Sequence, residues 1–167
     1  MEKEITEVYC GNGRGKNTLA IGQALRASSQ GKSVIIIQFL KGNERRELDF
    51  LEELDQLDIK IFRFEKMETC YDQLNEEEQV EEERNILNGL NFARKVIATQ
   101  ECDFLVLDEI LGLLDKHIAT VDMVVGLLKQ KDESMHLILT GNRVDPGILD
   151  YVDSVTTITT LGREQNS

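Results

Sequence analysis

The chain has 167 residues, 41% of them hydrophobic, and its 19 Lys and Arg against 31 Asp and Glu give a formal charge of −12. This length suits a single domain over residues 1–167, which buries roughly two-thirds of the surface of its unfolded chain. The acidic balance argues against a general nucleic-acid binder and against an anionic membrane as partner, because both need a basic surface. No apolar run approaches the ~20 residues that span a bilayer.

Cysteine usage and the first residues indicate the compartment. Cysteines at 10, 70 and 102, without a Cys-x-x-Cys pair, indicate neither a disulfide framework nor a zinc site. The segment Met1–Glu4 lacks the charged and then apolar pattern of a secretory signal. We therefore expect a soluble, cytoplasmic protein. Its acidity is concentrated in residues 44–83, with 16 acidic and 5 basic residues, whereas residues 1–43 hold 6 basic and 3 acidic ones.

Short apolar runs rich in β-branched residues predict six buried strands. They lie at 5–10, 34–40, 59–64, 104–107 and 137–139, with a weaker run at 155–159. Helical patterns lie between them, at 18–29, 46–57, 76–99, 121–130 and 147–152.

Three of the helices carry further signals. Val80, Leu87, Leu90 and Ile97 predict an apolar stripe on the long helix. Thr120 is expected to cap the helix over 121–130, and Asp145 before Pro146 to open the last helix.

Strands that alternate with helices predict an α/β fold, with a parallel sheet between two layers of helices. Ligands of such sheets bind at the carboxyl ends of the strands. The residues that directly follow the strands are therefore the functional candidates.

The strongest functional signal is a glycine-rich loop between the first strand and the first helix. It reads Cys10-Gly11-Asn12-Gly13-Arg14-Gly15-Lys16-Asn17-Thr18. The three glycines allow backbone N–H groups to face a phosphate chain, and the lysine adds a positive charge at the start of a helix. This is the context of a phosphate-binding loop. The alternative is a glycine-rich turn without a ligand.

Two positions depart from the pattern G-x-x-x-x-G-K-[ST]. Cys10 stands where a glycine is expected, and Asn17 stands where a metal-binding hydroxyl is expected, with Thr18 one residue late.

Polar residues after two later strands complete the candidate site. Asp108 and Glu109 follow the run 104–107 and are typical of metal-binding carboxylates at a strand end; solvated acids are the alternative. Arg143, in the sequence Leu139–Arg143, is placed to reach a phosphate, or else lies on the surface.

The other candidates have ordinary interpretations. Cys10 is expected to be a small buried hydrophobe rather than a reactive thiol. His117 is expected in a solvated loop, and His136 lacks partners for a metal. The acidic residues Glu76–Glu78 and Glu81–Glu83 are expected on the solvated face of the long helix.

Together these segments resemble the ATP:corrinoid adenosyltransferases, a family built on a phosphate-loop fold. The similarity runs in order from about residue 5 to 160. It is carried by Val8–Lys16, Ile37–Gly42, Leu105–Glu109, Leu139–Arg143 and Ile148–Val155.

The resemblance implies transfer of the adenosyl group of ATP to the Co(I) centre of a corrinoid, with release of triphosphate. Co(I) is itself a strong nucleophile, so the protein has to orient ATP, stabilise the leaving triphosphate and exclude water. By resemblance Lys16 and Glu109 are the catalytic residues. The resemblance also implies that Mg²⁺ or Mn²⁺ is held by Asn17, Asp108 and Glu109, and that the protein is a homodimer. The residues expected to bind ATP or corrinoid are Gly11, Asn12, Gly13, Arg14, Gly15, Lys16, Asn17, Thr18, Tyr71 and Arg143.

The sequence also departs from the family it resembles. Asn17 replaces a metal-binding threonine; its amide oxygen ligates hard cations but is neutral. Thr69-Cys70-Tyr71 represents the aromatic segment beside the corrinoid, with Tyr71 as the counterpart. The order Thr140–Arg143 differs from the usual Thr-Gly-Arg, and Leu161–Ser167 stands where a basic, glycine-containing tail is usual.

Two other functions remain open from the sequence. One is a degenerate family member that binds nucleotide or corrinoid as a sensor or partner subunit. The other is a phosphate-loop ATPase, which needs a hydroxyl at position 17 and a water-positioning residue near Asp108; the sequence offers neither. Whether the corrinoid is a biosynthetic intermediate or salvaged cobalamin is also open.

Overall fold

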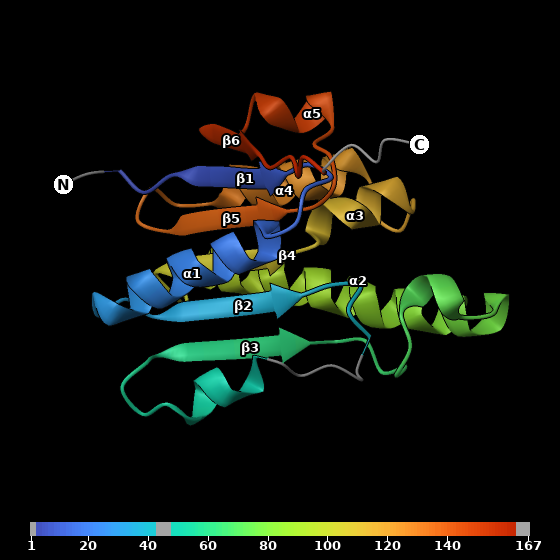
Figure 1. Ribbon diagram of the computed structural model, residues 1–167, viewed down its shortest axis with the longest axis horizontal. Coiled ribbons are helices and arrows are strands. Elements are labelled where there is room, and N and C mark those ends of the chain that lie inside the picture. The colour runs from blue at the N-terminus through green and yellow to red at the C-terminus, as the bar shows by residue number, and fades with distance from the viewer. Residues whose placement is uncertain (1–2, 43–47, 163–167) are drawn as a thin grey trace.

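The computed structural model describes residues 3–42 and 48–162. Parallel strands form one sheet in the order β3-β2-β4-β5-β1-β6 (Figure 1). All six predicted strands are confirmed, with ends that differ by at most two residues. They are β1 (Thr6–Cys10), β2 (Val34–Gln38), β3 (Ile59–Arg63), β4 (Phe104–Asp108), β5 (His136–Thr140) and β6 (Ser154–Thr157).

The α-helices of the described residues are α1 (Lys16–Ser29), α2 (Glu76–Thr99), α3 (Ile110–Asp115), α4 (Val121–Gln130) and α5 (Pro146–Leu149). The predicted bounds of α2 and α4 are confirmed, and the Thr120 hydroxyl caps α4 by accepting from the N–H of Met123. Helix α1 begins two residues early, α5 ends at Leu149, and α3 was not predicted. Short 3₁₀ turns are η1 (Asp49–Glu53) and η2 (Tyr71–Gln73).

The helix predicted over 46–57 is wrong in its described part, which holds only the 3₁₀ turn η1; residues 46 and 47 lie outside the described residues. Leu51 is buried there, but Phe50 and Leu54 are exposed. Apolar residues recur here at helical spacing, but Phe50 and Leu54 have no core to pack against, and burial supplies most helical stability.

The sheet has an apolar core on each face because alternate residues of a strand point to opposite sides. On one face Ile36 and Val106 pack with Ala24 of α1. On the other face Ile37 and Leu107 pack among residues of α2, α3, α4 and α5. Figure 1 shows α1 in front of the sheet and α2, α3 and α4 behind it. These layers confirm the predicted three-layer α/β fold.

The apolar stripe of α2 is confirmed only in part. Leu90 and Ile97 are buried and Leu87 is partly buried, but Val80 is 56% exposed. The first turns of α2 extend beyond the sheet (Figure 1), so an apolar residue there finds no core.

The prediction that all the glutamates of α2 are solvated is wrong for Glu82, which is 1% exposed. Its carboxylate accepts the backbone N–H groups of Lys66 at 2.9 Å and Met67 at 2.8 Å. The chain that leaves β3 crosses the helix here and satisfies the buried oxygens. No helix within residues 3–42 and 48–162 has the length and apolarity to cross a membrane.

Candidate active site

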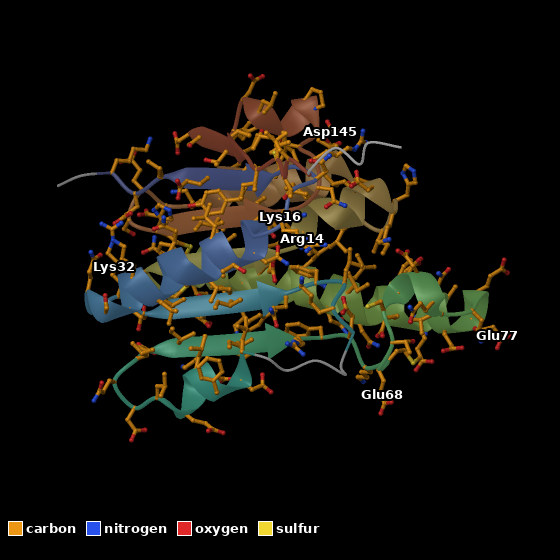
Figure 2. The ribbon with its side chains drawn as sticks, in the orientation of Figure 1. Arg14, Lys16, Lys32, Glu68, Glu77 and Asp145 are labelled. Atoms are coloured by element: carbon orange, nitrogen blue, oxygen red, sulfur yellow. The ribbon has the colours of Figure 1, made fainter. Side chains whose placement is uncertain are left out.

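The carboxyl ends of the strands bring most of the predicted site residues to one edge of the sheet. Gln38 pairs with Asp108 across β2 and β4, and Tyr9 pairs with Thr140 across β1 and β5. The glycine-rich loop starts directly after β1 and leads into α1. Figure 2 labels Arg14 and Lys16 where that helix begins.

Two glycines of the loop have a packing role that the sequence did not reveal. Gly13 donates its N–H to the carbonyl of Ile158 at 2.9 Å, and Arg14 donates its N–H to the Thr160 hydroxyl at 2.8 Å. A Cβ on Gly11 or Gly13 would lie 2.3 or 2.6 Å from the Ile158 carbonyl oxygen. The chain that leaves β6 therefore requires glycine at both positions, and it engages two of the N–H groups that were predicted to face a phosphate.

The amino end of α1 is open to an anion. Gly15 precedes the helix without a side-chain cap, and no acidic residue lies in the first turn. Helices α2, α4 and α5 are instead capped by Asn75, Thr120 and Asp145. The first N–H groups of a helix need acceptors, and the helix dipole favours a negative one. This end of α1 has the properties of a phosphate site.

Lys16 supplies the positive charge of the loop. Its ammonium donates to the Asn142 side-chain oxygen at 2.8 Å and to the Gly11 carbonyl at 3.4 Å. Asn142, in the loop after β5, thus holds the lysine across the glycine-rich loop. Sequence analysis assigned it no role.

Asp108 is a buried carboxylate with a set of hydrogen-bond donors around it. It is 1% exposed and accepts from the Thr140 hydroxyl at 2.9 Å and from the Gln38 amide at 3.3 Å. The ammonium of Lys41 lies 3.8 Å from it. Burial of a carboxyl group is costly unless donors and positive charges of this kind surround it.

Glu109 lies beside Asp108, but its carboxylate has fewer hydrogen-bond partners. Its backbone adopts a left-handed conformation with φ 64°, and its N–H donates to the Thr140 hydroxyl at 2.8 Å. Burial raises the pKa of Glu109, Asp108 acts in the same direction, and the ammonium groups of Lys41 and Lys16 oppose them. No side chain of the described residues donates to its carboxylate.

Asn17 joins Asp108 to Lys41. With its amide nitrogen towards Asp108 it donates to Oδ1 at 3.2 Å, and its oxygen accepts from the Lys41 ammonium at 2.6 Å. The opposite orientation would place oxygen against carboxylate and nitrogen against ammonium, so the chemistry of the neighbours selects this one.

The three predicted metal ligands, Asn17, Asp108 and Glu109, are thus brought together in space. Their carboxylate and amide oxygens are the donors that a hard divalent cation prefers. The Asn17 oxygen and Asp108, however, already have protein partners. Within residues 3–42 and 48–162 no group of three or more His, Cys, Asp or Glu side chains forms a metal cluster.

A cleft of about 660 Å³ lies beside the loop and extends towards η2. Asn17, Lys41, Asp108, Thr69 and Cys70 are among the residues that line it. Tyr71 follows them but its hydroxyl donates to Glu83 at 2.5 Å, and burial, then Glu83, raises the pKa of Tyr71 to about 12.

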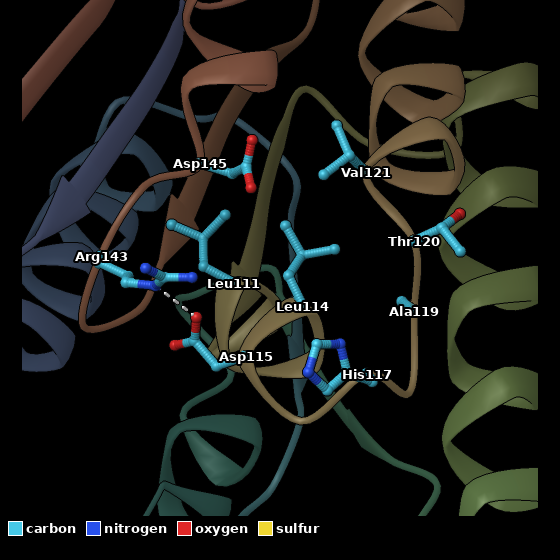
Figure 3. Close-up of a pocket in the computed structure, with 9 residues that line it drawn as sticks. All are labelled: Leu111, Leu114, Asp115, His117, Ala119, Thr120, Val121, Arg143 and Asp145. Carbon is cyan, nitrogen blue, oxygen red and sulfur yellow. Dashed lines mark hydrogen bonds and ion pairs between the residues drawn. The ribbon is translucent and has the colours of Figure 1, made fainter.

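Arg143 lies away from this cleft. Its guanidinium pairs with Asp115 at 2.8 Å, and both residues line a separate pocket of about 250 Å³ (Figure 3). His117 lines the same pocket and is exposed, as predicted. The structure therefore does not bring Arg143 to the phosphate loop.

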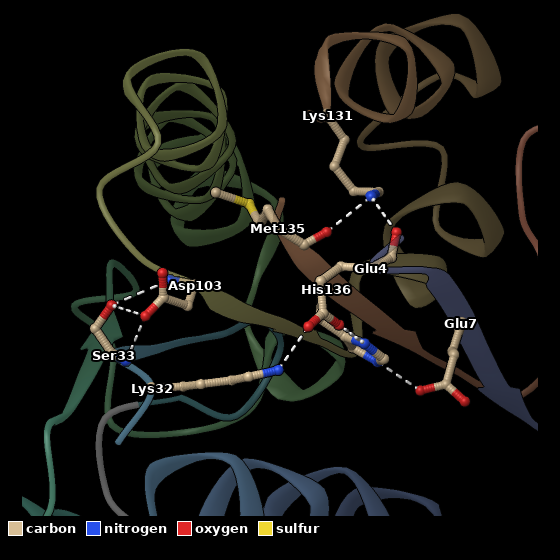
Figure 4. Close-up of polar contacts among 8 residues, drawn as sticks. All are labelled: Glu4, Glu7, Lys32, Ser33, Asp103, Lys131, Met135 and His136. Carbon is tan, nitrogen blue, oxygen red and sulfur yellow. Dashed lines mark hydrogen bonds and ion pairs between the residues drawn. The ribbon is translucent and has the colours of Figure 1, made fainter. Parts of the chain in front are cut away.

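His136 lies at the opposite, amino end of the strands. Its two ring nitrogens are 3.1 Å from Glu4 and 2.7 Å from Glu7 (Figure 4). The ring also stacks on Phe104. Cys10 is buried, in agreement with its expected role as a small hydrophobe.

The site includes residues that sequence reasoning missed. Gln38 ends β2 as Asp108 ends β4, while Lys41 and Glu65 lie two or three residues beyond the ends of β2 and β3; this position near a strand end is the signal that could have found them. Thr140 ends β5 and Asn142 lies two residues later, and both were considered only for the similarity around Arg143.

The parallel sheet, the loop after β1 and the acidic pair at the end of β4 define a phosphate-loop nucleotide-binding protein of the α/β class. The crystal structure of a KaiC-like protein, PH0186, from Pyrococcus horikoshii OT3 shares the fold with a TM-score of 0.62 at 19% identity. The match covers 93% of this chain and 71% of that one.

Sequence comparison narrows this class to one family. Residues 2–165 match the family ATP:corrinoid adenosyltransferase BtuR/CobO/CobP. The corrinoid adenosyltransferase of Escherichia coli (strain K12) is 30% identical over 160 residues, which are 93% of this chain and 76% of that protein. Corrinoid adenosyltransferase CobA of Salmonella typhimurium is 28% identical over 158 residues, with the same coverage. The chain belongs to the corrinoid adenosyltransferase family.

Proposed function

We propose that this protein transfers the adenosyl group of ATP to the Co(I) centre of a reduced corrinoid. The Co(I) electron pair forms the bond to C5′ while the C5′–O bond breaks, and triphosphate leaves with the bonding electrons. The cleft carries this proposal, because one cavity is lined both by Asn17 and Asp108 beside the phosphate loop and by Thr69 and Cys70, from the segment that resembles the family's corrinoid-side segment.

In the proposed complex the triphosphate lies at the open amino end of α1. The N–H groups of the first helical turn and the Lys16 ammonium would bind phosphate oxygens and stabilise the leaving group. Tyr71 would pack beside the corrinoid through its ring, while its hydroxyl donates to Glu83. We assign Arg143 no contact with ATP in this arrangement.

A divalent cation, Mg²⁺ or Mn²⁺, is part of the proposal. Glu109 would be its main ligand, since its carboxylate has no side-chain donor among the described residues, with Asp108 and Asn17 beside it. When bound, the cation would offset the negative charge that develops on the triphosphate as it leaves, which is a role in the transfer step and separate from ATP binding. On the family resemblance we also propose that the protein is a cytoplasmic homodimer and that its substrates are small molecules only.

The test is a turnover assay with protein, ATP, Mg²⁺ and chemically reduced cob(I)alamin. Loss of the Co(I) absorbance together with one triphosphate per adenosylcobalamin would support the transfer. Inorganic phosphate in place of triphosphate would support an ATPase, and nucleotide or corrinoid binding without turnover would support a degenerate sensor subunit.

Lys16→Ala is the informative variant. We expect turnover to fall about a hundredfold or more, because the variant removes a charge that stabilises the leaving triphosphate. Lys95→Ala, an exposed lysine on α2, is the matched control. Unchanged turnover in Lys16→Ala would exclude the assigned role of the loop.

A further inference from the structure

Position 17 is where the structure departs most from a metal-dependent phosphate loop. A hydroxyl at this position would be a free ligand for a cation. The Asn17 amide instead spans two protein groups, Asp108 at 3.2 Å and the Lys41 ammonium at 2.6 Å. A cation that used this oxygen would have to displace Lys41.

Lys41 is held by the fold rather than by this contact alone. Buried Glu65 accepts the backbone N–H groups on both sides of it, from Leu40 at 2.6 Å and from Gly42 at 3.0 Å. Leu40 has φ 62° and Gly42 has φ 63°, and a Cβ on Gly42 would lie 2.7 Å from the Glu68 carbonyl oxygen. These constraints fix the backbone on both sides of Lys41, and the Asn17 amide and Asp108 then hold its ammonium at the site.

The charge at this position matters because Asp108 is buried. A triphosphate that binds near a buried carboxylate is repelled unless a positive charge lies between or beside them. In metal-dependent loops the divalent cation offsets that repulsion. Here the Lys41 ammonium, 3.8 Å from Asp108, is a positive charge built into the chain.

We infer that Lys41, held by Asn17, supplies the positive charge that lets this chain bind ATP without a divalent cation. The inference rests on the proposed nucleotide site and adds to it the way in which the site balances charge. The N–H groups at the amino end of α1 and the Lys16 ammonium remain as phosphate donors, and none of them needs a metal.

The test measures ATP binding by isothermal titration calorimetry, once in EDTA and once in excess MgCl₂. For the wild-type protein we expect the two dissociation constants to agree within about threefold. A tenfold difference between dissociation constants would correspond to about 1.4 kcal/mol of binding free energy. Lys41→Met should lose at least about tenfold in EDTA and recover part of that loss with Mg²⁺, since the cation replaces the missing charge.

Asn17→Thr is the second variant, and it keeps every charge. It releases Lys41 and restores a hydroxyl, so ATP affinity should become dependent on Mg²⁺ by about tenfold or more. Lys60→Met, an exposed lysine on β3, is the matched control for loss of one positive charge. Circular dichroism verifies that each variant is folded, and Asn17→Thr carries the test if Lys41→Met is not.

Three results would overturn the inference. Wild-type affinity that falls more than about tenfold in EDTA would show that the metal is required. Lys41→Met or Asn17→Thr with wild-type behaviour in both buffers would show that the contact is irrelevant. Failure of ATP to bind in either buffer would also remove the proposed nucleotide site, whereas binding only with Mg²⁺ would overturn this inference alone.

Discussion

At the scale of single residues, buried carboxylates hold the backbone around the site. Glu65 accepts N–H groups from the turn that carries Lys41, and Glu82 accepts N–H groups from the chain just after Glu65. Both carboxylates are buried, and each is satisfied by backbone donors. Such groups confer a defined geometry, because removing an acceptor leaves buried donors unpaired.

The titration of Glu65 gives a prediction at this scale. Burial is the main cause that raises the pKa of Glu65 above its ordinary value of 4.5, while the N–H groups of Leu40 and Gly42 oppose it. The folded protein therefore keeps a proton that the unfolded chain has lost. The contribution of this proton to stability is full below about pH 4.5 and is lost as the pH rises through the folded-state pKa.

Glu65→Gln lacks this proton equilibrium. We expect the free energy of unfolding of the wild type, relative to the variant, to fall as the pH is raised from 4.5, by at most about 1.4 kcal/mol for each pH unit. Urea denaturation at a series of pH values measures it. Glu52→Gln, an exposed carboxyl, is the control. A difference that grows in favour of the wild type would contradict the raised pKa.

At the scale of elements, α1 shows how one helix serves two purposes. Its small Ala20 and Ala24 let it lie close on the sheet, and its uncapped amino end faces the site. Gly22 serves neither purpose, since it is exposed and a Cβ there would meet nothing within 4 Å. The preceding loop is different, because its glycines contact the chain after β6.

Gly22→Ala should therefore stabilise the protein by about 0.5–1 kcal/mol, through the higher helix propensity of alanine. Gly13→Ala is the contrasting variant, and it should destabilise the protein because its Cβ would lie 2.6 Å from the Ile158 carbonyl oxygen. Thermal denaturation measures both. If Gly22→Ala lowered the melting temperature, the helix would have a contact at that residue that the structure lacks.

At the scale of the whole molecule, the charge is unevenly distributed. The formal charge is −12, and residues 44–83 hold 16 of the 31 acidic residues. The loop and α1 belong to the basic segment 1–43, which suits a polyanion, while most of the acid surplus lies in residues 44–83. Self-repulsion of this acidic surface opposes the compact state.

We therefore expect the melting temperature to rise between about 0.02 and 0.2 M KCl, as the Debye length shrinks towards 8 Å and the repulsion is screened. Differential scanning calorimetry measures it. Choline chloride at the same ionic strengths serves as the control, since screening does not depend on the identity of the cation. A melting temperature that falls with salt would show that attractive ion pairs, such as Lys32–Glu4 at 2.6 Å, dominate instead.

Much of the fold and part of the site were predictable from the sequence alone. Strand runs, helix caps and the loop Cys10–Thr18 are local signals, because hydrophobic periodicity and glycine placement act over a few residues. The failures have tertiary causes: Val80 finds no core, Glu82 is covered by the chain after β3, and the apolar residues Phe50 and Leu54 stay exposed because no core lies against them.

The sequence by itself determined that this is a phosphate-loop α/β protein of the corrinoid adenosyltransferase family, because each motif that identifies the family is a continuous stretch of residues. Only the tertiary structure decided which side chains meet at the site. It placed Lys41 against Asn17 and Asp108, and it paired Arg143 with Asp115 away from the loop. These contacts join residues far apart in the chain, and only the strand order β3-β2-β4-β5-β1-β6 and its register bring them together.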